Sequence, residues 1–450
     1  MKVAVIGTGY VGLVSGVCLA ARGHDVTCLE VSPDVIARVN RGQPHIYEQG
    51  LEALLATVLA EGRFRVVLPS AAALEGCRIV VVAVGTPSTH GRIDLRQVET
   101  AARLVGEYLQ GSSVRCSVVV RSTVVPGTTD TAVRGWLEAA SGKQLGDFGL
   151  GMNPEFLREG EAVADFMGPD RIVLGCETEA TWQDLQELYA PWTCEKLRVN
   201  SRTAEMIKYA NNALLATQIS AVNELANIAA AIGGVDIYEV MAGVHADKRW
   251  SPVLPSGERC RPGIVTYLWP GCGFGGSCFP KDVQAIRSLA RDVGVEPQLL
   301  SAVLNINEEQ PHQIVSMLKR AGVVVRGRRA LVLGLAFKPD TDDVRESASL
   351  KVIEDLLAEG ATVKAHDPMA TANAKRLRPD LSVQYLTDWE PAVAWADIVV
   401  VATRWTEYLR LRGAELREQL RGDVVFDARR CFGRADFPDA TYLSIGHRPR

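Results

Sequence analysis

Residues 2–12 read KVAVIGTGYVG, and this stretch decides the fold. Lys2–Ile6 is a short apolar run, and glycines follow it at positions 7, 9 and 12. From Val11 to Arg22 the residues are mostly apolar and contain no proline, so a buried helix is expected there. The stretch therefore predicts a strand, a tight glycine turn and a helix, which open a βαβ unit.

The glycine turn has the G-x-G-x-x-G spacing of a dinucleotide site. Gly7 allows the tight turn, Gly9 lets the backbone approach a pyrophosphate, and Gly12 permits close packing of the helix on the strand. The N-terminus of the helix then faces the anion. Glu30 ends the next predicted strand, Asp25–Glu30. A carboxylate there accepts hydrogen bonds from ribose hydroxyls and repels a 2′-phosphate, so NAD is predicted rather than NADP.

The rest of the chain extends this pattern. Arg78–Val84 and Val114–Val120 are β-branched runs without alternation, which is typical of parallel strands buried on both faces. From Thr203 to Ala231 apolar residues recur at helical spacing. Near Arg328 a second series of strand and helix signals begins. We therefore predict an α/β fold with two Rossmann-like doubly wound domains joined by a long central helix.

Composition narrows the class of protein. The 450 residues carry a net charge of −4, with 47% apolar and 23% charged residues, an ordinary globular balance. This charge gives no reason to expect nucleic acid or a membrane surface as a partner. No apolar run is long enough for a membrane helix. The ten cysteines contain no C-x-x-C pair, which argues against a metal site and against a secreted disulfide framework. A cytoplasmic protein with reduced thiols is expected.

Residues 273–282 read GFGGSCFPKD and form the most informative loop. A thiol after a glycine-rich turn can approach a substrate carbonyl, although most cysteines are simply small buried side chains. Lys208 and Asn212 are four residues apart on one face of the predicted long helix. Glu155 and Glu159 have the same spacing in NPEFLREG. Each feature alone fits a surface charge or a cap, but their combination with Cys278 favours a catalytic site.

With these motifs the chain resembles the UDP-glucose/GDP-mannose dehydrogenase family, and within it the UDP-glucose 6-dehydrogenase branch. The resemblance covers nearly the whole chain and includes VAVGTP (82–87), RSTVVPGTT (121–129), EMIKYANNA (205–213) and GLAFKPDTDDVRES (334–347). It implies NAD-dependent oxidation of a nucleoside-diphosphate hexose at C6 to the uronate. UDP-glucose is the first substrate expected, and the same chemistry on dTDP-glucose or GDP-mannose stays an alternative.

The resemblance also implies roles for individual residues. Cys278 resembles the nucleophile that forms a thiohemiacetal and then a thioester. Lys208 and Asn212 resemble the groups that hold the sugar O6 and its oxyanion. Asp282 resembles the partner that orders water and Lys208. These four residues are what a catalytically inactive NAD sensor or scaffold would have lost. A cysteine hydrolase or acyltransferase is disfavoured because no Cys–His pairing stands out.

Hydrolysis of the thioester needs a base. The resemblance assigns Glu155, with Thr123, to acid/base work and to positioning water, and a partly buried Glu155 is expected to have its pKa raised toward neutrality. The implied cofactor-binding set is Gly7, Gly9, Tyr10, Val11, Gly12, Glu30, Thr86, Thr123, Glu159 and Arg345. The implied substrate-binding set is Glu155, Phe156, Leu157, Arg158, Lys208, Asn212, Arg249, Tyr267, Gly275, Phe337 and Lys338.

Three domains are expected on this basis: an NAD-binding domain (1–200), a central helical dimerisation and substrate region with the cysteine loop (201–310), and a nucleotide-sugar-binding domain (320–450). A homodimer through the long helix is expected. Two departures stand out. Val35 occupies a position where the family often has Lys or Arg near the adenosine ribose. Residues 250–268 are longer than the usual loop, which leaves the role of Arg249 open.

Overall fold

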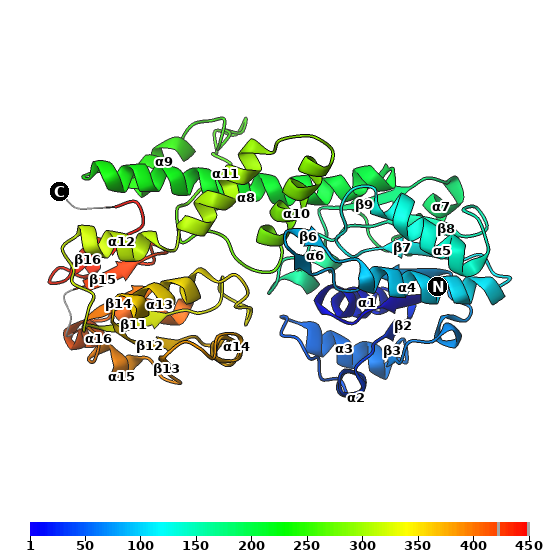
Figure 1. Ribbon diagram of the computed structural model, residues 1–450, viewed down its shortest axis with the longest axis horizontal. Coiled ribbons are helices and arrows are strands. Elements are labelled where there is room, and N and C mark those ends of the chain that lie inside the picture. The colour runs from blue at the N-terminus through cyan, green and yellow to red at the C-terminus, as the bar shows by residue number, and fades with distance from the viewer. Residues whose placement is uncertain (421–423, 448–450) are drawn as a thin grey trace. The chain divides into compact units, whose positions relative to one another are not determined.

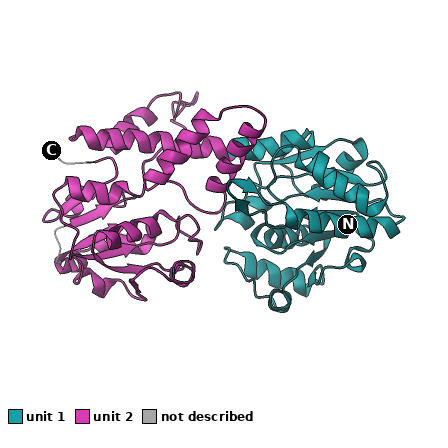
Figure 2. Ribbon diagram, viewed as in Figure 1, with its two compact units in different colours: residues 1–211 teal, residues 212–450 magenta. Residues whose placement is uncertain are grey.

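The structure is a computed structural model that describes residues 1–420 and 424–447. Residues 421–423 and 448–450, which belong to the predicted third domain, lie outside the described residues. The chain divides into two compact units, residues 1–211 and 212–450 (Figure 2). Helix α8 (Ser201–Ile232) contributes residues to both units.

Unit 1 is a doubly wound α/β unit, and Figure 1 labels many of its helices and strands. The strands of its main sheet are β1 (Lys2–Ile6), β2 (Asp25–Leu29), β3 (Phe64–Val67), β4 (Ile79–Val82), β7 (Ser117–Val120), β8 (Gly149–Met152), β9 (Arg171–Cys176) and β10 (Glu195–Val199). The sheet order is β10-β9-β8-β7-β4-β1-β2-β3. Neighbouring strands are parallel except β8 and β9. Strands β2 and β3 lie on one side of β1, and the chain then crosses to the other side, where it forms β4 and the later strands. The strand order therefore reverses between β1 and β4.

The other elements of unit 1 connect these strands. The helices are α1 (Tyr10–Ala21), α2 (Pro33–Val39), α3 (Leu51–Ala60), α4 (Arg96–Gly111), α5 (Arg134–Ser141), α6 (Ala162–Met167) and α7 (Glu179–Leu188). The short elements are η1 (Ala71–Leu74), η2 (Thr128–Val133) and the hairpin of β5 (Ser88–Thr89) and β6 (Arg92–Ile93).

Both faces of this sheet are buried. In β4, Ile79 and Val81 pack into one hydrophobic cluster, whereas Val80 and Val82 pack into another. Successive strand residues point to opposite faces, so a strand buried on both sides has no polar alternation. This explains the continuous β-branched runs of the sequence. The run 114–120 becomes a strand only from Ser117, because Ser117 pairs with Ile79, the first residue of β4.

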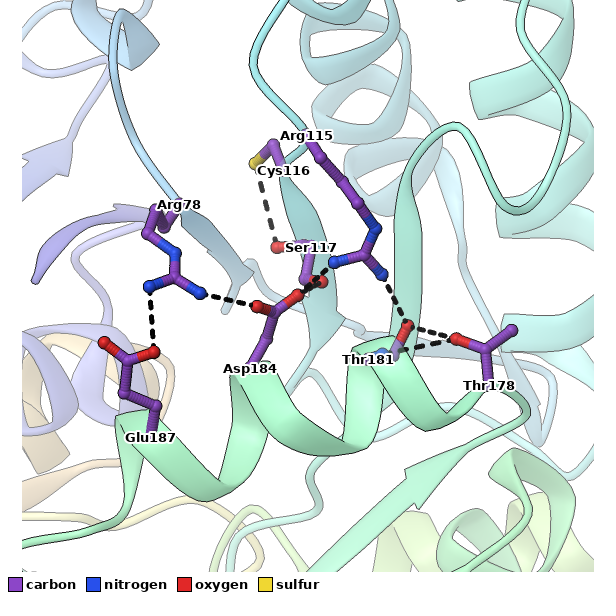
Figure 3. A network of polar contacts seen from close by, with 8 residues as sticks. All are labelled: Arg78, Arg115, Cys116, Ser117, Thr178, Thr181, Asp184 and Glu187. Carbon is purple, nitrogen blue, oxygen red and sulfur yellow. Dashed lines mark hydrogen bonds and ion pairs between the residues drawn. The ribbon is translucent and has the colours of Figure 1, made fainter.

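A buried aspartate ties helix α7 to the starts of two strands (Figure 3). The carboxylate of Asp184 accepts hydrogen bonds from Arg78, 2.9 Å away, and from Ser117, 2.5 Å away, and it also contacts Arg115. Asp184 is 7% exposed. The two cations and the hydroxyl hold its pKa below the usual value, although burial alone would raise it. The cluster lies at the edge where β4 and β7 begin, opposite the edge at which ligands bind in such sheets.

The described part of unit 2 contains a second, all-parallel sheet. Its strands are β11 (Arg329–Leu333), β12 (Thr362–His366), β13 (Val383–Tyr385), β14 (Ile398–Val401), β15 (Val424–Asp427) and β16 (Thr441–Ser444), in the order β13-β12-β11-β14-β15-β16. The helices of this sheet's part of the chain are α13 (Ala348–Ala358), α14 (Thr371–Leu377), α15 (Glu390–Val393) and α16 (Ala414–Gln419), and the short helical turns are η4 (Thr406–Arg412) and η5 (Arg434–Asp436).

The helical part of unit 2 precedes this sheet. It comprises the second half of α8, then α9 (Ile237–His245), η3 (Gly263–Tyr267), α10 (Phe279–Asp292), α11 (Gln298–Glu309) and α12 (Gln313–Arg320). Helix α8 begins at Ser201, two residues earlier than predicted. The reason is that the side-chain oxygen of Asn200, just before the helix, accepts a hydrogen bond from the amide of Thr203. Gly233, with φ +75°, follows the last turn. The predicted fold class, two Rossmann-like units and a long central helix, is confirmed. No helix in the described ranges is long and apolar enough to span a membrane.

Candidate active site

The glycine turn of unit 1 has the shape that a dinucleotide requires. Gly7 has φ +95°, and a Cβ there would lie 2.8 Å from the carbonyl oxygen of Ala83. A Cβ on Gly12 would lie 2.0 Å from the carbonyl oxygen of Gly7. At Gly9, by contrast, a Cβ would meet no atom within 4 Å. The turn is therefore tight where it packs on the protein and open at the N-terminus of α1, where a pyrophosphate binds.

Glu30 follows β2 at the same edge of the sheet. Its carboxylate accepts a hydrogen bond from the hydroxyl of Thr8 and one from the amide of Ser32, 2.9 Å away. A carboxylate oxygen has more than one lone pair, so these two bonds leave Glu30 able to accept from a ribose. Ser122, which follows β7, donates to the carbonyl oxygen of Val84 and thereby fixes the loop that carries Thr123. NAD fits this edge, with Glu30 on its ribose and the amides of α1 on its pyrophosphate.

Glu155 and Lys208 form a buried ion pair in unit 1. Glu155 lies in the loop after β8, Lys208 lies on α8, and Lys208 Nζ is 2.7 Å from Glu155 Oε1. Their side chains are 6% and 4% exposed. The second carboxylate oxygen accepts a hydrogen bond from the amide of Leu157, 2.7 Å away. Phe156 covers the pair, with its ring centroid 5.7 Å from Lys208 Nζ.

The expected direction of the pKa of Glu155 is wrong. Burial by itself would raise this pKa, but the charge and hydrogen bond of Lys208, the amide of Leu157 and the charge of Arg121 outweigh it and hold the pKa below its usual value. Glu155 is therefore an anion at neutral pH. It can accept a proton without first losing one.

Asn212 and Asp282 form a second buried polar pair, in unit 2. Asn212 lies on α8, and its Nδ2 donates to Oδ2 of Asp282 on α10 at 2.7 Å. The other oxygen of Asp282 accepts from Lys281 Nζ at 2.8 Å. Asp282 is 1% exposed and Asn212 is 4% exposed. The bond orients the amide of Asn212, whose oxygen and nitrogen otherwise have no fixed direction.

Cys278 stands at the N-terminal end of α10. It is the residue directly before the helix, its carbonyl oxygen accepts a hydrogen bond from the amide of Asp282, and its thiol is half-buried. Its Sγ lies 3.6 Å from the hydroxyl oxygen of Ser277. The thiolate is the form of a cysteine that attacks a carbonyl.

The cysteine loop packs on the loop after β11 in unit 2. A Cβ on Gly275 would lie 2.4 Å from the carbonyl oxygen of Glu346 and 3.0 Å from Cβ of Phe337. Gly276, with φ +77°, donates its amide to the carbonyl oxygen of Arg345 at 2.9 Å. Of the predicted substrate residues, Gly275 and Phe337 are thus brought together. Only glycine allows this approach of two backbones.

The other predicted site residues are distributed over both units. Arg345 pairs with Asp343, and Lys338 lies 5.9 Å from the ring centroid of Phe337. In unit 1, Thr86 is buried, Glu159 is half-buried, and Arg158 pairs with Asp165. Tyr267 ends η3 and is half-buried. Arg249 pairs with Asp247, and its side chain is 83% exposed.

One supporting residue carries no signal in the sequence. Asn307, on α11, accepts a hydrogen bond from the amide of Phe274 at 2.7 Å and donates to its carbonyl oxygen at 3.0 Å. A Cβ on Gly273 would lie 2.6 Å from the same side chain. Asn307 thus fixes the start of the cysteine loop through two hydrogen bonds to the backbone of Phe274. A single asparagine within a helical stretch does not stand out from surface asparagines.

Unit 2 contains a turn with the same arrangement as the glycine turn of unit 1, but the acid beside it is fully hydrogen-bonded within the unit. Gly334 follows β11 with φ +99°, and Asp367 follows β12, as Gly7 and Glu30 follow β1 and β2. Asp367 is 4% exposed. Its carboxylate accepts N–H bonds from Leu335, Ala336, Met369, Ala370 and Trp405. The carboxylate of Asp367 is thus occupied by five N–H groups of unit 2, whereas the carboxylate of Glu30 accepts two hydrogen bonds and can accept more.

A glycine turn that is open at the N-terminus of α1, with the carboxylate of Glu30 at the same edge of the sheet, is the arrangement of a nicotinamide-dependent oxidoreductase. Comparison with protein families agrees. The NAD binding domain of the UDP-glucose/GDP-mannose dehydrogenase family matches residues 1–193, its central domain matches 202–309, and its UDP binding domain matches 331–434. The chain belongs to this family, and its cofactor is NAD. It is an NAD-dependent oxidoreductase, and it is similar to curated UDP-glucose 6-dehydrogenases.

Individual relatives are similar over their full length. UDP-glucose 6-dehydrogenase AglM of Haloferax volcanii is 40% identical over 443 residues, which cover 97% of this chain and 98% of the relative. UDP-glucose 6-dehydrogenase YwqF of Bacillus subtilis is 36% identical, covering 100% and 98%. Among solved structures, a UDP-glucose dehydrogenase from Pyrobaculum islandicum superposes with a TM-score of 0.88 at 39% identity, covering 99% and 98%.

Proposed function

We propose that the chain oxidises the C6 primary alcohol of UDP-glucose to the carboxylate in two successive two-electron steps, through a thioester on Cys278. The overall change consumes one alcohol, one water and two NAD⁺, and yields one carboxylate, two NADH and three protons. NAD, when bound, accepts the hydride removed from C6 at each step. The residues of the chain hold O6, form the covalent bond to carbon and activate water.

Two groups on α8 act on the sugar oxygen O6. Lys208 and Asn212 are one turn apart on the same face of α8, and both donate hydrogen bonds. Donors of this kind stabilise an alkoxide or oxyanion at O6, and each well-placed one contributes about 3–4 kcal/mol to the transition state. Asp282 fixes the direction of the Asn212 amide, so it acts as a positioning residue.

The thiol of Cys278 acts on the sugar carbon C6. The Sγ of Cys278 adds to the C6 aldehyde left by the first oxidation, and O6 takes up the proton, which gives a thiohemiacetal. Loss of a second hydride from C6 and of the O6 proton gives the thioester. Water then attacks C6, the C–S bond breaks, and the thiolate leaves. The covalent bond keeps the reactive aldehyde from escaping between the steps.

Glu155 serves hydrolysis as a general base. Because Lys208 keeps its carboxylate ionised, Glu155 can take a proton from the attacking water at neutral pH. Thr123, in the loop after β7, is proposed to position that water. The observation that carries the proposal is the pairing on α8, where two successive donors are each bound to a buried acid, one ion-paired and one hydrogen-bonded.

The test is a count of NADH per sugar with UDP-glucose, dTDP-glucose and GDP-mannose. Wild-type protein should release two NADH per UDP-glucose and act more slowly on the other two sugars, because the compared relatives are named for UDP-glucose. Cys278→Ser should abolish net turnover and retain a covalent or aldehyde-level adduct on the protein, visible by mass spectrometry. Cys260→Ser, at an exposed cysteine, is the matched control. Two NADH per sugar at the normal rate from Cys278→Ser would refute the nucleophile.

We also propose that two copies associate through α8 and α9, in the cytoplasm. Large apolar side chains of these helices are exposed in the single chain, namely Leu214, Leu225, Ile228, Ile232, Val240 and Val244. A contiguous exposed apolar surface marks an interface in a protein otherwise of ordinary polarity. Light scattering should give a dimer mass, and Leu225→Glu with Ile228→Glu should give a monomer. A monomer already in the wild type would refute the interface.

A further inference from the structure

Glu48 connects two segments that are far apart in the sequence. It lies in the loop between α2 and α3, and it is only 6% exposed. Its Oε2 accepts a hydrogen bond from the hydroxyl of Tyr10 and one from the amide of Gly160 at 2.9 Å, and its Oε1 accepts from the amide of Ala162 at 2.9 Å. A buried carboxylate is unstable without such partners. Each carboxylate oxygen of Glu48 has at least one.

The first partner belongs to the dinucleotide turn. Tyr10 is the first residue of α1 and stands between Gly9 and Gly12. Burial raises the pKa of Tyr10, and the hydrogen bond to Glu48 raises it further, so the phenol stays protonated and remains a donor. Its hydroxyl oxygen also lies 3.3 Å from the amide of Gly160. Tyr10, Glu48 and Gly160 therefore form one closed group.

The second partner segment is the loop that carries Glu155. Gly160 ends this loop with φ +85°, and Ala162 begins α6. Glu155 and Glu159 lie in the same loop, and Glu155 is held near its other end by Lys208 and by the amide of Leu157. The loop is thus fixed at one end through the ion pair and at the other end through Glu48.

We propose that Glu48 is a positioning residue that couples the dinucleotide turn to residues 154–162, so that NAD bound at the turn orders the loop that holds Glu155. A dinucleotide on the N-terminus of α1 restrains Tyr10, which restrains Glu48, which in turn restrains the amides of Gly160 and Ala162. The inference rests on NAD as the cofactor and needs neither the sugar nor the thioester chemistry. It can therefore fail or hold independently of the proposed reaction.

Hydrogen exchange of the full chain with and without saturating NAD tests this coupling. In the wild type, NAD should slow exchange in peptides covering both residues 7–14 and residues 155–163. In Tyr10→Phe and in Glu48→Gln, NAD should still slow exchange at 7–14, but the slowing at 155–163 should fall about fivefold, the effect of one lost hydrogen bond. The double variant should lose no more than Glu48→Gln, because both changes break the same connection.

Tyr47→Phe and Glu52→Gln are matched controls, since both side chains are exposed neighbours of the same chemical types. They should behave as the wild type does. Equal NAD-dependent slowing at 155–163 in the wild type and in Tyr10→Phe would overturn the proposal. So would fast exchange at 155–163 in Glu48→Gln that NAD restores to the wild-type value. Should Glu48→Gln fail to fold, Tyr10→Phe decides alone, because it removes one oxygen from a half-buried side chain.

Discussion

Lys208 Nζ lies 2.7 Å from Oε1 of Glu155, although 53 positions separate the two residues in the chain. The pair joins α8 to the loop after β8, inside unit 1, and both side chains are buried. Against the effect of burial, the ammonium of Lys208 is the largest of the influences that lower the pKa of Glu155. A change at Lys208 therefore alters the pKa of Glu155.

Replacing Lys208 with Met should affect both rate and stability. Without the ammonium, burial dominates and the pKa of Glu155 rises above its ordinary value of 4.5. The acid limb of the kcat profile should move to higher pH, and kcat should fall about 10²–10³-fold at neutral pH while KM changes little. Steady-state kinetics between pH 5 and 9 measure this. A change in KM alone would reduce Lys208 to a binding residue.

The stability of Lys208→Met should also depend on pH. In the wild type the pKa of Glu155 is lowered, so the pair stabilises the fold above pH 4.5 and this contribution is lost as the pH falls below that value. An uncompensated buried carboxylate costs about 3–5 kcal/mol. Lys208→Met should therefore melt at a lower temperature at pH 8 than at pH 5, relative to the wild type. Lys208→Met with Glu155→Gln should lose this pH dependence, and equal profiles for both variants would contradict the argument.

Asp282→Asn tests whether Asp282 acts through Asn212. The substitution keeps the shape but leaves one acceptor oxygen where Asp282 offers one to Asn212 and one to Lys281, and it removes the charge, so the amide of Asn212 is held less firmly. We expect kcat to fall about 10–100-fold with little change in KM. Glu296→Gln, on the exposed segment after α10, is the control. A higher KM at unchanged kcat would show that Asp282 serves substrate binding instead.

Glu205 should make the stability of the wild type depend on pH. It lies on α8, is fully buried, and accepts hydrogen bonds from the amides of Gly127 at 2.6 Å and Thr129 at 2.8 Å. Burial, with a smaller effect of Asp130, raises its pKa to about 7. A raised pKa means that its contribution to stability is present below pH 4.5, the ordinary pKa, and is lost as the pH rises through about 7.

Glu205→Gln removes this titration. Relative to that variant, the wild type should become less stable between pH 5 and pH 8, by up to about 3 kcal/mol, since one pKa unit corresponds to about 1.4 kcal/mol. Unfolding in urea at pH 5, 6.5 and 8 measures the difference. Asp130 and Arg202 face each other near this carboxylate, so Asp130→Asn is a useful second variant. Parallel stability profiles for wild type and Glu205→Gln would contradict the raised pKa.

Asp184→Asn should destabilise unit 1 without touching the chemistry. It removes the charge that Arg78 and Arg115 share at the start of β4 and β7 (Figure 3). A loss of about 2–4 kcal/mol is expected because Asp184 is nearly buried. Glu187→Gln removes only the exposed partner of Arg78, and should cost less than about 1 kcal/mol. Thermal unfolding separates the two, and a similar cost for both would show that burial of Asp184 is unimportant.

The sequence could predict the parts of the fold that depend on local pattern. The glycine spacing located the first turn, and the β-branched runs located the strands, although β7 is shorter than its run because β4 limits it. Contacts between distant segments could not be read from the chain. The carboxylates of Glu155, Glu48 and Glu205 look alike in sequence. Their partners, however, are an ammonium with one amide for Glu155, a phenol with two amides for Glu48, and two amides for Glu205. For this reason the sequence predicts the pKa of Glu155 in the wrong direction.

Asp367 and Glu30 follow equivalent strands, but the carboxylate of Asp367 is saturated by five N–H groups of its own surroundings. Of these two turns, the first alone keeps a carboxylate available to a ribose. The proposed removal of four electrons from one alcohol then requires the dinucleotide site of unit 1 to be refilled halfway through the turnover. In that mechanism the reduced cofactor has to leave while the half-oxidised sugar stays bound, so the lifetime of the proposed sulfur–carbon bond would set how long the exchange can take.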